Sequence, residues 1–149
     1  MDIFSFKLGL LSFWGLWFAS ACSTNLCDGF RTWGIFHRTW PFASGNFKNL
    51  TDAIQVWSPP WWLSWLLFSA VVSWQLLAAL LFGWAVLSSL MKGSMDLAII
   101  NSAFTVALGL WVAFMLVDEI LKQYDTEHNH ILFFMAQLLS FMPIYVLPS

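Results

Sequence analysis

The stretch Trp61–Leu90, WWLSWLLFSAVVSWQLLAALLFGWAVLSSL, decides the fold of this chain. It contains no charged side chain, and its polar members are serines and Gln75. A helix of roughly 20 apolar residues is enough to cross the hydrocarbon core of a bilayer, so this stretch is longer than a span requires. Inside hydrocarbon every backbone N–H and C=O must be bonded within its own segment, which an α-helix achieves. The stretch therefore predicts a transmembrane helix that tilts or protrudes from the membrane.

Three more apolar stretches lie at about 3–27, 97–121 and 131–147. The first starts with a cation, Lys7, and passes through Ala19–Cys22, a pattern that also resembles a signal peptide with its cleavage site. We expect it to be a retained first helix. The last stretch is short for a span, and its Pro143 is expected to kink the helix or end it early. These stretches predict an all-α fold with one domain over residues 1–149, a transmembrane bundle of four helices.

Between the first two spans, residues 29–60 mix charged and turn-forming residues with bulky aromatic residues. We expect this segment to lie along the membrane interface as one or two short helices, and Ser58-Pro59-Pro60 to start the next helix. Tryptophan is favoured where its ring meets hydrocarbon and its N–H meets headgroup water. The predicted interfacial aromatic residues are Trp33, Trp40, Trp61, Trp62 and Trp65.

The composition is that of a membrane protein, with 60% hydrophobic and 9% charged residues, whereas soluble domains carry about 25% charged residues. Only six Lys and Arg occur and the net charge is -2, so no basic stripe is available to neutralise phosphates. We therefore expect the lipid bilayer and other integral membrane subunits as partners, and no nucleic acid. The 11 Trp and 15 Phe residues indicate interfacial belts, or alternatively a stacking surface for a pigment or quinone.

Five polar residues within or beside the spans are predicted to form an interhelical polar network. Gln75 is the most informative, because it lies near the middle of its helix and its amide should bond across to another helix. A role for Gln75 in binding a ligand or passing a proton is the alternative. Asp118 and Glu119 point about 100° apart on a helix, so one can face inward while the other faces water. The predicted network comprises Asn25, Asp28, Gln75, Asn101 and Glu119.

The sequence offers no catalytic constellation such as a GxSxG motif, a P-loop or a GxGxxG motif, and we expect no enzyme activity. His128 and His130 are weak candidates for metal ligands, since further ligands at a recognisable spacing are missing. Cys22 and Cys27 are five residues apart, which leaves open a short disulfide or two small apolar helix residues. We predict no cofactor, and we expect bound lipid.

The chain resembles a family of small predicted bacterial integral membrane proteins, a four-span domain of unknown function. Asn25-Leu26-Cys27-Asp28 is similar to its Asn-x-x-Asp motif, Ser58-Pro59 to its Ser-Pro helix entry, and Trp74–Leu80 to its Trp-Glu-x-Leu-x-Ala stretch. Trp111, Phe114, Glu119 and Phe133-Phe134 fall where the family has aromatic, Glu and Phe-Phe positions. The chain departs from the family at Gln75, where the family has Glu, and at 118–124. The resemblance implies a multi-pass protein of the bacterial inner membrane and supplies no activity.

The leading functional expectation is a non-catalytic accessory or scaffold subunit of a larger membrane protein complex, such as an energy-transducing one. One alternative is a small protein that holds a quinone, haem, pigment or metal between its helices. Another is a homo-oligomeric channel, in which Gln75 and Asn101 would line a wet path.

Overall fold

The computed structural model of the chain describes residues 2–148, and all of its regular elements there are helices. Four are long: α1 (Ile3–Thr32), α3 (Trp61–Lys92), α4 (Leu97–Leu121) and α5 (Tyr124–Val146). A short helix α2 (Asn46–Ile54) and a 3₁₀ turn (Gln55–Trp57) lie between α1 and α3. The four long helices are apolar and long enough to cross a membrane, as in a multi-pass integral membrane protein. The predicted all-α bundle of four helices is confirmed.

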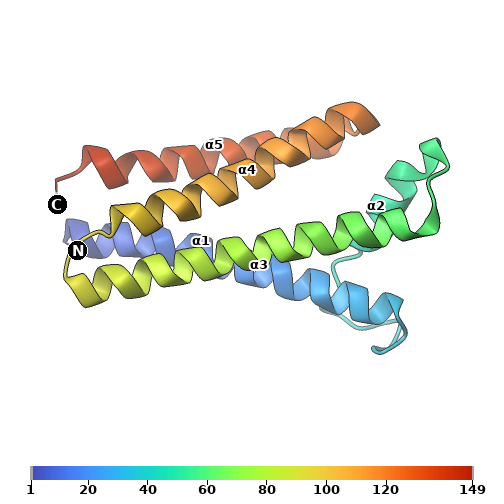
Figure 1. The fold of residues 1–149 in the computed structure, drawn as a ribbon, viewed down its shortest axis with the longest axis horizontal. Coiled ribbons are helices and arrows are strands. Elements are labelled where there is room, and N and C mark those ends of the chain that lie inside the picture. Colours follow the sequence, from blue (N-terminus) through green and yellow to red (C-terminus); the bar gives the residue numbers. More distant parts are fainter. Residues whose placement is uncertain (1, 149) are drawn as a thin grey trace.

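The long helices pack as successive antiparallel neighbours (Figure 1). α1 packs against α3, α3 against α4, and α4 against α5, while α5 meets α1 only sparsely. The N- and C-terminal ends lie at one end of the bundle, and α2 with its loops lies at the other end (Figure 1). The segment between the first two spans is thus gathered at a single end of the bundle.

Three helices extend beyond the predicted apolar limits. α1 continues to Thr32, α3 continues to Lys92, and α5 begins at Tyr124, seven residues before the predicted span. Asp125 and Glu127 occupy the first turn of α5, where negative charge is favourable at the positive end of the helix dipole. α5 also continues through Pro143 to Val146, so the expectation of an early end at this proline was wrong. The proline lies in the last turn, where few helical bonds follow it.

Turns are short where the helices meet. Gly93 follows α3 in the left-handed region at φ 65°, and its N–H bonds to the Leu90 carbonyl, a common end for a helix. Gly45 precedes α2 with φ 81°, a conformation that other residues rarely adopt. Gly93 thus allows a short turn between α3 and α4, and Gly45 allows the chain to turn into α2.

The bundle core alternates small and aromatic side chains. A Cβ at Gly15 of α1 would lie 3.3 Å from the Cβ of Phe82, so these two helices approach very closely. Small residues permit such approach in membranes, where packing drives helix association in place of the hydrophobic effect. The buried core residues are Leu11, Trp14, Phe18, Ala78, Phe82, Ala85, Ile100, Ala103, Phe104, Ala107, Leu110, Trp111 and Ile144. Side chains therefore occupy the space between the helices over most of their length.

Candidate functional site

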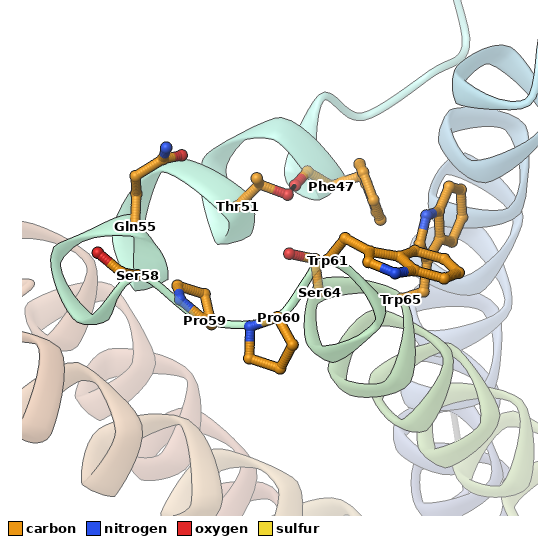
Figure 2. Close-up of a pocket in the computed structure, with 9 residues that line it drawn as sticks. All are labelled: Phe47, Thr51, Gln55, Ser58, Pro59, Pro60, Trp61, Ser64 and Trp65. Atoms are coloured by element: carbon orange, nitrogen blue, oxygen red, sulfur yellow. Dashed lines mark hydrogen bonds between the residues drawn. The ribbon is translucent and has the colours of Figure 1, made fainter.

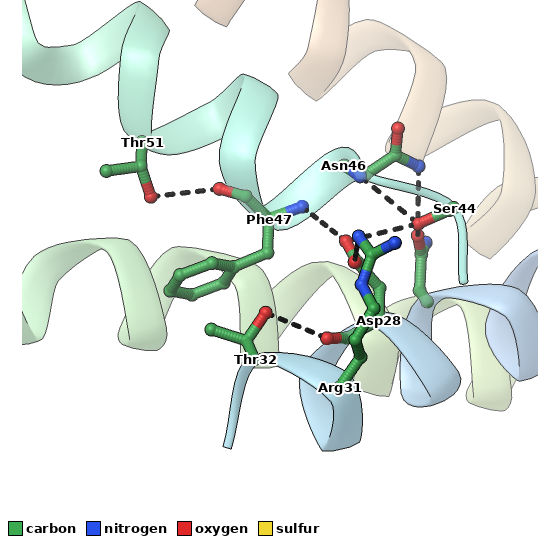
Figure 3. Close-up of polar contacts among 8 residues, drawn as sticks. Asp28, Arg31, Thr32, Ser44, Asn46, Phe47 and Thr51 are labelled. Atoms are coloured by element: carbon green, nitrogen blue, oxygen red, sulfur yellow. Dashed lines mark hydrogen bonds and ion pairs between the residues drawn. The ribbon is translucent and has the colours of Figure 1, made fainter. Parts of the chain in front are cut away.

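Asp28, near the end of α1, is the centre of a polar cluster that joins α1 to α2. The residue is 0% exposed. Its Oδ2 accepts the backbone N–H of Phe47 at 2.8 Å and the Ser44 hydroxyl at 3.4 Å. Its Oδ1 pairs with the guanidinium of Arg31, one turn further along α1 (Figure 3). Because hydrogen bonds to charged groups are the stronger ones, this carboxylate holds the start of α2 against the end of α1.

Asn25 lies three residues before Asp28 and therefore on the same face of α1. Its Oδ1 accepts the Ser44 hydroxyl at 2.7 Å and the Asn46 amide at 2.9 Å. Its Nδ2 donates to Oε1 of Gln75 at 2.8 Å. Asn25 thus bonds simultaneously to the loop before α2 and to α3.

Gln75 carries the cluster toward the middle of the bundle. It is 6% exposed and lies one or two residues from the midpoint of α3, so a centred helix places it near the bilayer midplane. A side-chain amide at that depth needs an internal partner, and Asn25 supplies it. The structure therefore brings together three residues of the predicted network, Asn25, Asp28 and Gln75.

The other two predicted network residues lie elsewhere. Asn101 is exposed and accepts the hydroxyl of Tyr145, which links α4 to α5 at the end that carries the chain termini. Glu119 is exposed, and the structure does not bring it together with the other predicted network residues. Its neighbour Asp118 points inward instead, because consecutive helical residues differ by about 100° in direction.

Asp118 forms a second cluster, with α5. Its Oδ2 lies 2.5 Å from Nδ1 of His130, and its Oδ1 accepts the Thr126 hydroxyl at 3.1 Å. The His130 ring also stacks on Phe114, with 4.7 Å between ring centroids. His130 and His128 were both weak candidates for metal ligands, and His128 is exposed. Within residues 2–148, no group of three or more His, Cys, Asp or Glu side chains is placed to hold a metal ion.

Trp111 and Gln137 form a buried contact that the sequence reasoning missed. The indole N–H of Trp111 donates to Oε1 of Gln137 at 2.8 Å. Trp17 of α1 packs against Trp111 and against Phe133 of α5, with 5.4 Å and 5.0 Å between the ring centroids. Gln137 interrupts the apolar run of α5, as Gln75 interrupts that of α3. This interruption is the one feature of the sequence that could have predicted a buried polar contact at Gln137.

Two cationic contacts stabilise the end of the bundle that carries the termini. Lys7 is buried, and its ammonium donates to the carbonyls of Ile144 at 3.0 Å and Leu147 at 2.9 Å, which satisfies the C-terminal end of α5. In the turn after α3, hydrogen bonds from Lys92 and then Ser88 hold the pKa of Asp96 below its ordinary value. Both contacts tie helix ends together.

The two cysteines are both free thiols on α1. Cys22 is buried, and its Sγ lies 3.7 Å from the Val72 carbonyl of α3. Cys22 and Cys27 therefore act as small apolar helix residues, and they do not form a disulfide in this structure.

The loop segment 33–60, from the end of α1 to the start of α3, presents an apolar surface. Trp33 stacks on Trp65 with 5.1 Å between centroids, and Phe47 lies 4.1 Å from Trp65. Of the predicted interfacial tryptophans, Trp33, Trp40, Trp61 and Trp62 are exposed and Trp65 is half-buried. Further exposed apolar side chains in the segment are Ile35, Phe42, Val56 and Trp57.

Comparisons with protein families, with curated proteins and with solved structures found no match to this chain. The residues and their geometry therefore carry the functional argument. The strongest arrangement is the Asn25–Asp28 cluster with the loop segment that it holds in place.

Proposed function

We propose that the chain is a non-catalytic accessory subunit of a larger membrane protein complex, and that the loop segment 33–60 is its docking surface. One observation carries this proposal. A buried carboxylate and a buried amide hold the segment to the bundle, while Val56 is 85% exposed, Phe42 66% and Trp57 65%. A fixed backbone that presents large apolar side chains is typical of a surface that another molecule covers.

Preorganisation supports a docking role for the segment. A binding surface that is ordered in advance avoids the entropy loss of ordering on association, and the contacts of Asp28 and Asn25 order this segment. Trp33, Trp40 and Trp57 supply large rigid side chains, the type that is enriched at the centre of protein interfaces. The segment therefore has the features expected of a subunit contact.

The polar side chains within the helices also favour a structural role. Asn25 and Gln75 bond to each other, and Asp28 and Asp118 bond to groups of the same chain. The channel alternative has little support from this arrangement, because Gln75 faces α1 and is not placed on the outer surface where copies of the chain would meet. We place the protein in the bacterial inner membrane on the basis of the family resemblance.

Particle mass in mild detergent tests the proposal. We expect wild-type protein extracted from its own membrane to migrate as a particle larger than one chain, with another integral membrane protein in fixed stoichiometry. The variant Val56→Ser/Trp57→Ser should shift the chain to a smaller particle. The matched control Leu80→Ser/Trp84→Ser, on the lipid-facing side of α3, should not. A monodisperse particle of this chain alone contradicts the proposal.

The geometry of His130 supports a second candidate function, that of a small intramembrane ligand-binding protein. Asp118 holds Nδ1 of this ring, and Phe114 stacks on its face, so its orientation is fixed. An oriented imidazole of this kind suits a metal or haem ligand, as carboxylate-bound histidines do in metal sites. An absorption spectrum and a metal analysis of the purified protein test this candidate, and a colourless, metal-free sample excludes haem, pigment and metal.

A further inference from the structure

A pocket of about 470 Å³ opens between α2, the 3₁₀ turn and the first turns of α3. Phe47 of α2 and Trp61 and Trp65 of α3 form aromatic walls, and Pro59 and Pro60 form part of the rim (Figure 2). No contact described above requires this space. A pocket of this size is within the range that holds small ligands.

The walls of the pocket are fixed by contacts outside it. The backbone N–H of Phe47 bonds to Asp28, and the Phe47 ring packs against Trp65 and Phe68 at 4.1 and 5.3 Å. Prolines 59 and 60 restrict the chain at the rim. The walls are therefore held by contacts that do not depend on a ligand.

Two features of the pocket favour binding of a hydrogen-bond acceptor. Ser64 is 6% exposed, and its hydroxyl points into the pocket (Figure 2). Its oxygen is not among the fully buried side-chain atoms that lack a hydrogen-bond partner, so it is reachable from the pocket, where an acceptor can receive its proton. In addition, α3 begins at Trp61 without a side-chain cap, and the positive end of its dipole lies at the pocket.

The distance of Ser64 from the bilayer midplane indicates which part of a lipid can reach the pocket. The midpoint of α3 lies between residues 76 and 77, so Ser64 is about 12 residues, or roughly 19 Å along the helix, from the midplane. The hydrocarbon core ends about 15 Å from the midplane and the headgroups extend to about 22 Å. In a bilayer centred on an upright α3, Ser64 would therefore lie just outside the hydrocarbon core, in the layer that contains the glycerol esters and headgroups.

We propose that this pocket binds one phospholipid, with an ester carbonyl accepting the Ser64 hydroxyl and an acyl chain against the Phe47 and Trp65 rings. The lining residues include no lysine or arginine, so the ester and the apolar chain provide recognition, and headgroup charge does not. The proposal is independent of the accessory function, because it requires no partner protein.

Native mass spectrometry of the delipidated full chain, titrated with a diester phosphatidylcholine and its diether analogue, tests the proposal. We expect wild-type protein to retain one diester lipid about fivefold more tightly than the diether lipid, the effect of one ordinary hydrogen bond. Ser64→Ala should lower diester retention about fivefold and remove the preference. The matched control Ser102→Ala, an exposed serine of α4, should change neither.

Equal retention of the diester and diether lipids by wild-type protein overturns the ester contact, as does an unaltered preference in Ser64→Ala. Ser64→Leu removes the hydroxyl and puts a bulkier side chain into the pocket, so retention of this lipid should fall below that of Ser64→Ala; full retention in a folded Ser64→Leu protein overturns the site itself. Because Ser64→Ala only removes a hydroxyl, it keeps the test valid if Ser64→Leu fails to fold. A prenylquinone extracted with the native protein in place of the phospholipid overturns the ligand assignment.

Discussion

Replacing Asp28 with asparagine should loosen the attachment of the start of α2 to α1 without unfolding the helices. The substitution keeps the size of the side chain and one acceptor oxygen, but it removes the charge that receives Phe47 N–H, the Ser44 hydroxyl and Arg31. The packing of the four long helices does not involve these contacts. The effect should therefore be local to the end of α1 and the start of α2.

The free-energy cost of Asp28→Asn can be estimated from the type and the exposure of each contact that Asp28 makes. A hydrogen bond to a charged group contributes about 1.5–3 kcal/mol and a neutral one about 0.5–1.5, so the Phe47 contact should lose roughly 1–1.5 kcal/mol. The Arg31 side chain is 27% exposed and can turn toward headgroups, so losing its pair should cost only about 0.5 kcal/mol. The sum, roughly 1.5–2 kcal/mol, corresponds to about a 10- to 30-fold shift in the local opening equilibrium.

Amide hydrogen exchange of the protein in lipid nanodiscs measures this opening. Exchange of Phe47 N–H and the first turn of α2 should accelerate about 10- to 30-fold in Asp28→Asn, while α4 stays unchanged. Asp52→Asn is the matched control on α2, because its carboxylate is exposed and pairs only with Lys48 at the surface; it should change exchange less than about twofold. If Phe47 exchanges within twofold of wild type in Asp28→Asn, the carboxylate does not hold the segment and the reasoning fails.

Three further contacts give separate predictions. In an Asn25→Ala/Gln75→Leu double-mutant cycle, reversible SDS unfolding should give a coupling of about 0.6 kcal/mol, the average for interhelical hydrogen bonds in membranes, and a value of zero would exclude the pair. Because the pKa of Asp96 is lowered in the folded state, its bond to Lys92 should stabilise the α3–α4 turn above pH 3.8 and be lost as the pH falls through the lowered pKa. Thermal unfolding between pH 6 and pH 2 should show this loss in wild type and not in Asp96→Asn. Lys7→Met should accelerate exchange in the last turn of α5, and equal exchange would show that its carbonyls need no cap.

Hydropathy predicted the spans but not all of the helix ends. The bounds of α4, 97–121, agree with its apolar run, because its caps, Asp96 and the left-handed Lys122, are the polar residues at the two ends of the run. In α5 the polar residues from Tyr124 to His130 remain helical. An apolar run reports where the chain lies in hydrocarbon, whereas a helix continues into the interface wherever its first-turn charges and its contacts allow.

The candidate site could be predicted only in part, because hydropathy does not report the path of a loop or the rotation of a helix. The spacing of Asn25 and Asp28 puts them on one face of α1, and the depth of Gln75 implies a partner on another helix. Ser44 and Asn46 gave no such signal, because their bonds depend on the path of the loop that precedes α2. The choice of Asp118 over Glu119 depends on the rotation of α4, which a helix apolar on all sides does not reveal.

The pattern of exposure along the loop segment narrows the surface that a partner would cover. α2 turns Ile54 toward the bundle and exposes Lys48, Asn49 and Asp52, so its outer face suits water or headgroups and needs no protein partner. Val56 and Trp57, in the 3₁₀ turn after α2, are 85% and 65% exposed and are the most exposed apolar side chains at this end of α2. If a subunit docks on this protein, the contact should therefore centre on the 3₁₀ turn after α2, which is why substitutions there discriminate more sharply than substitutions on α2 itself.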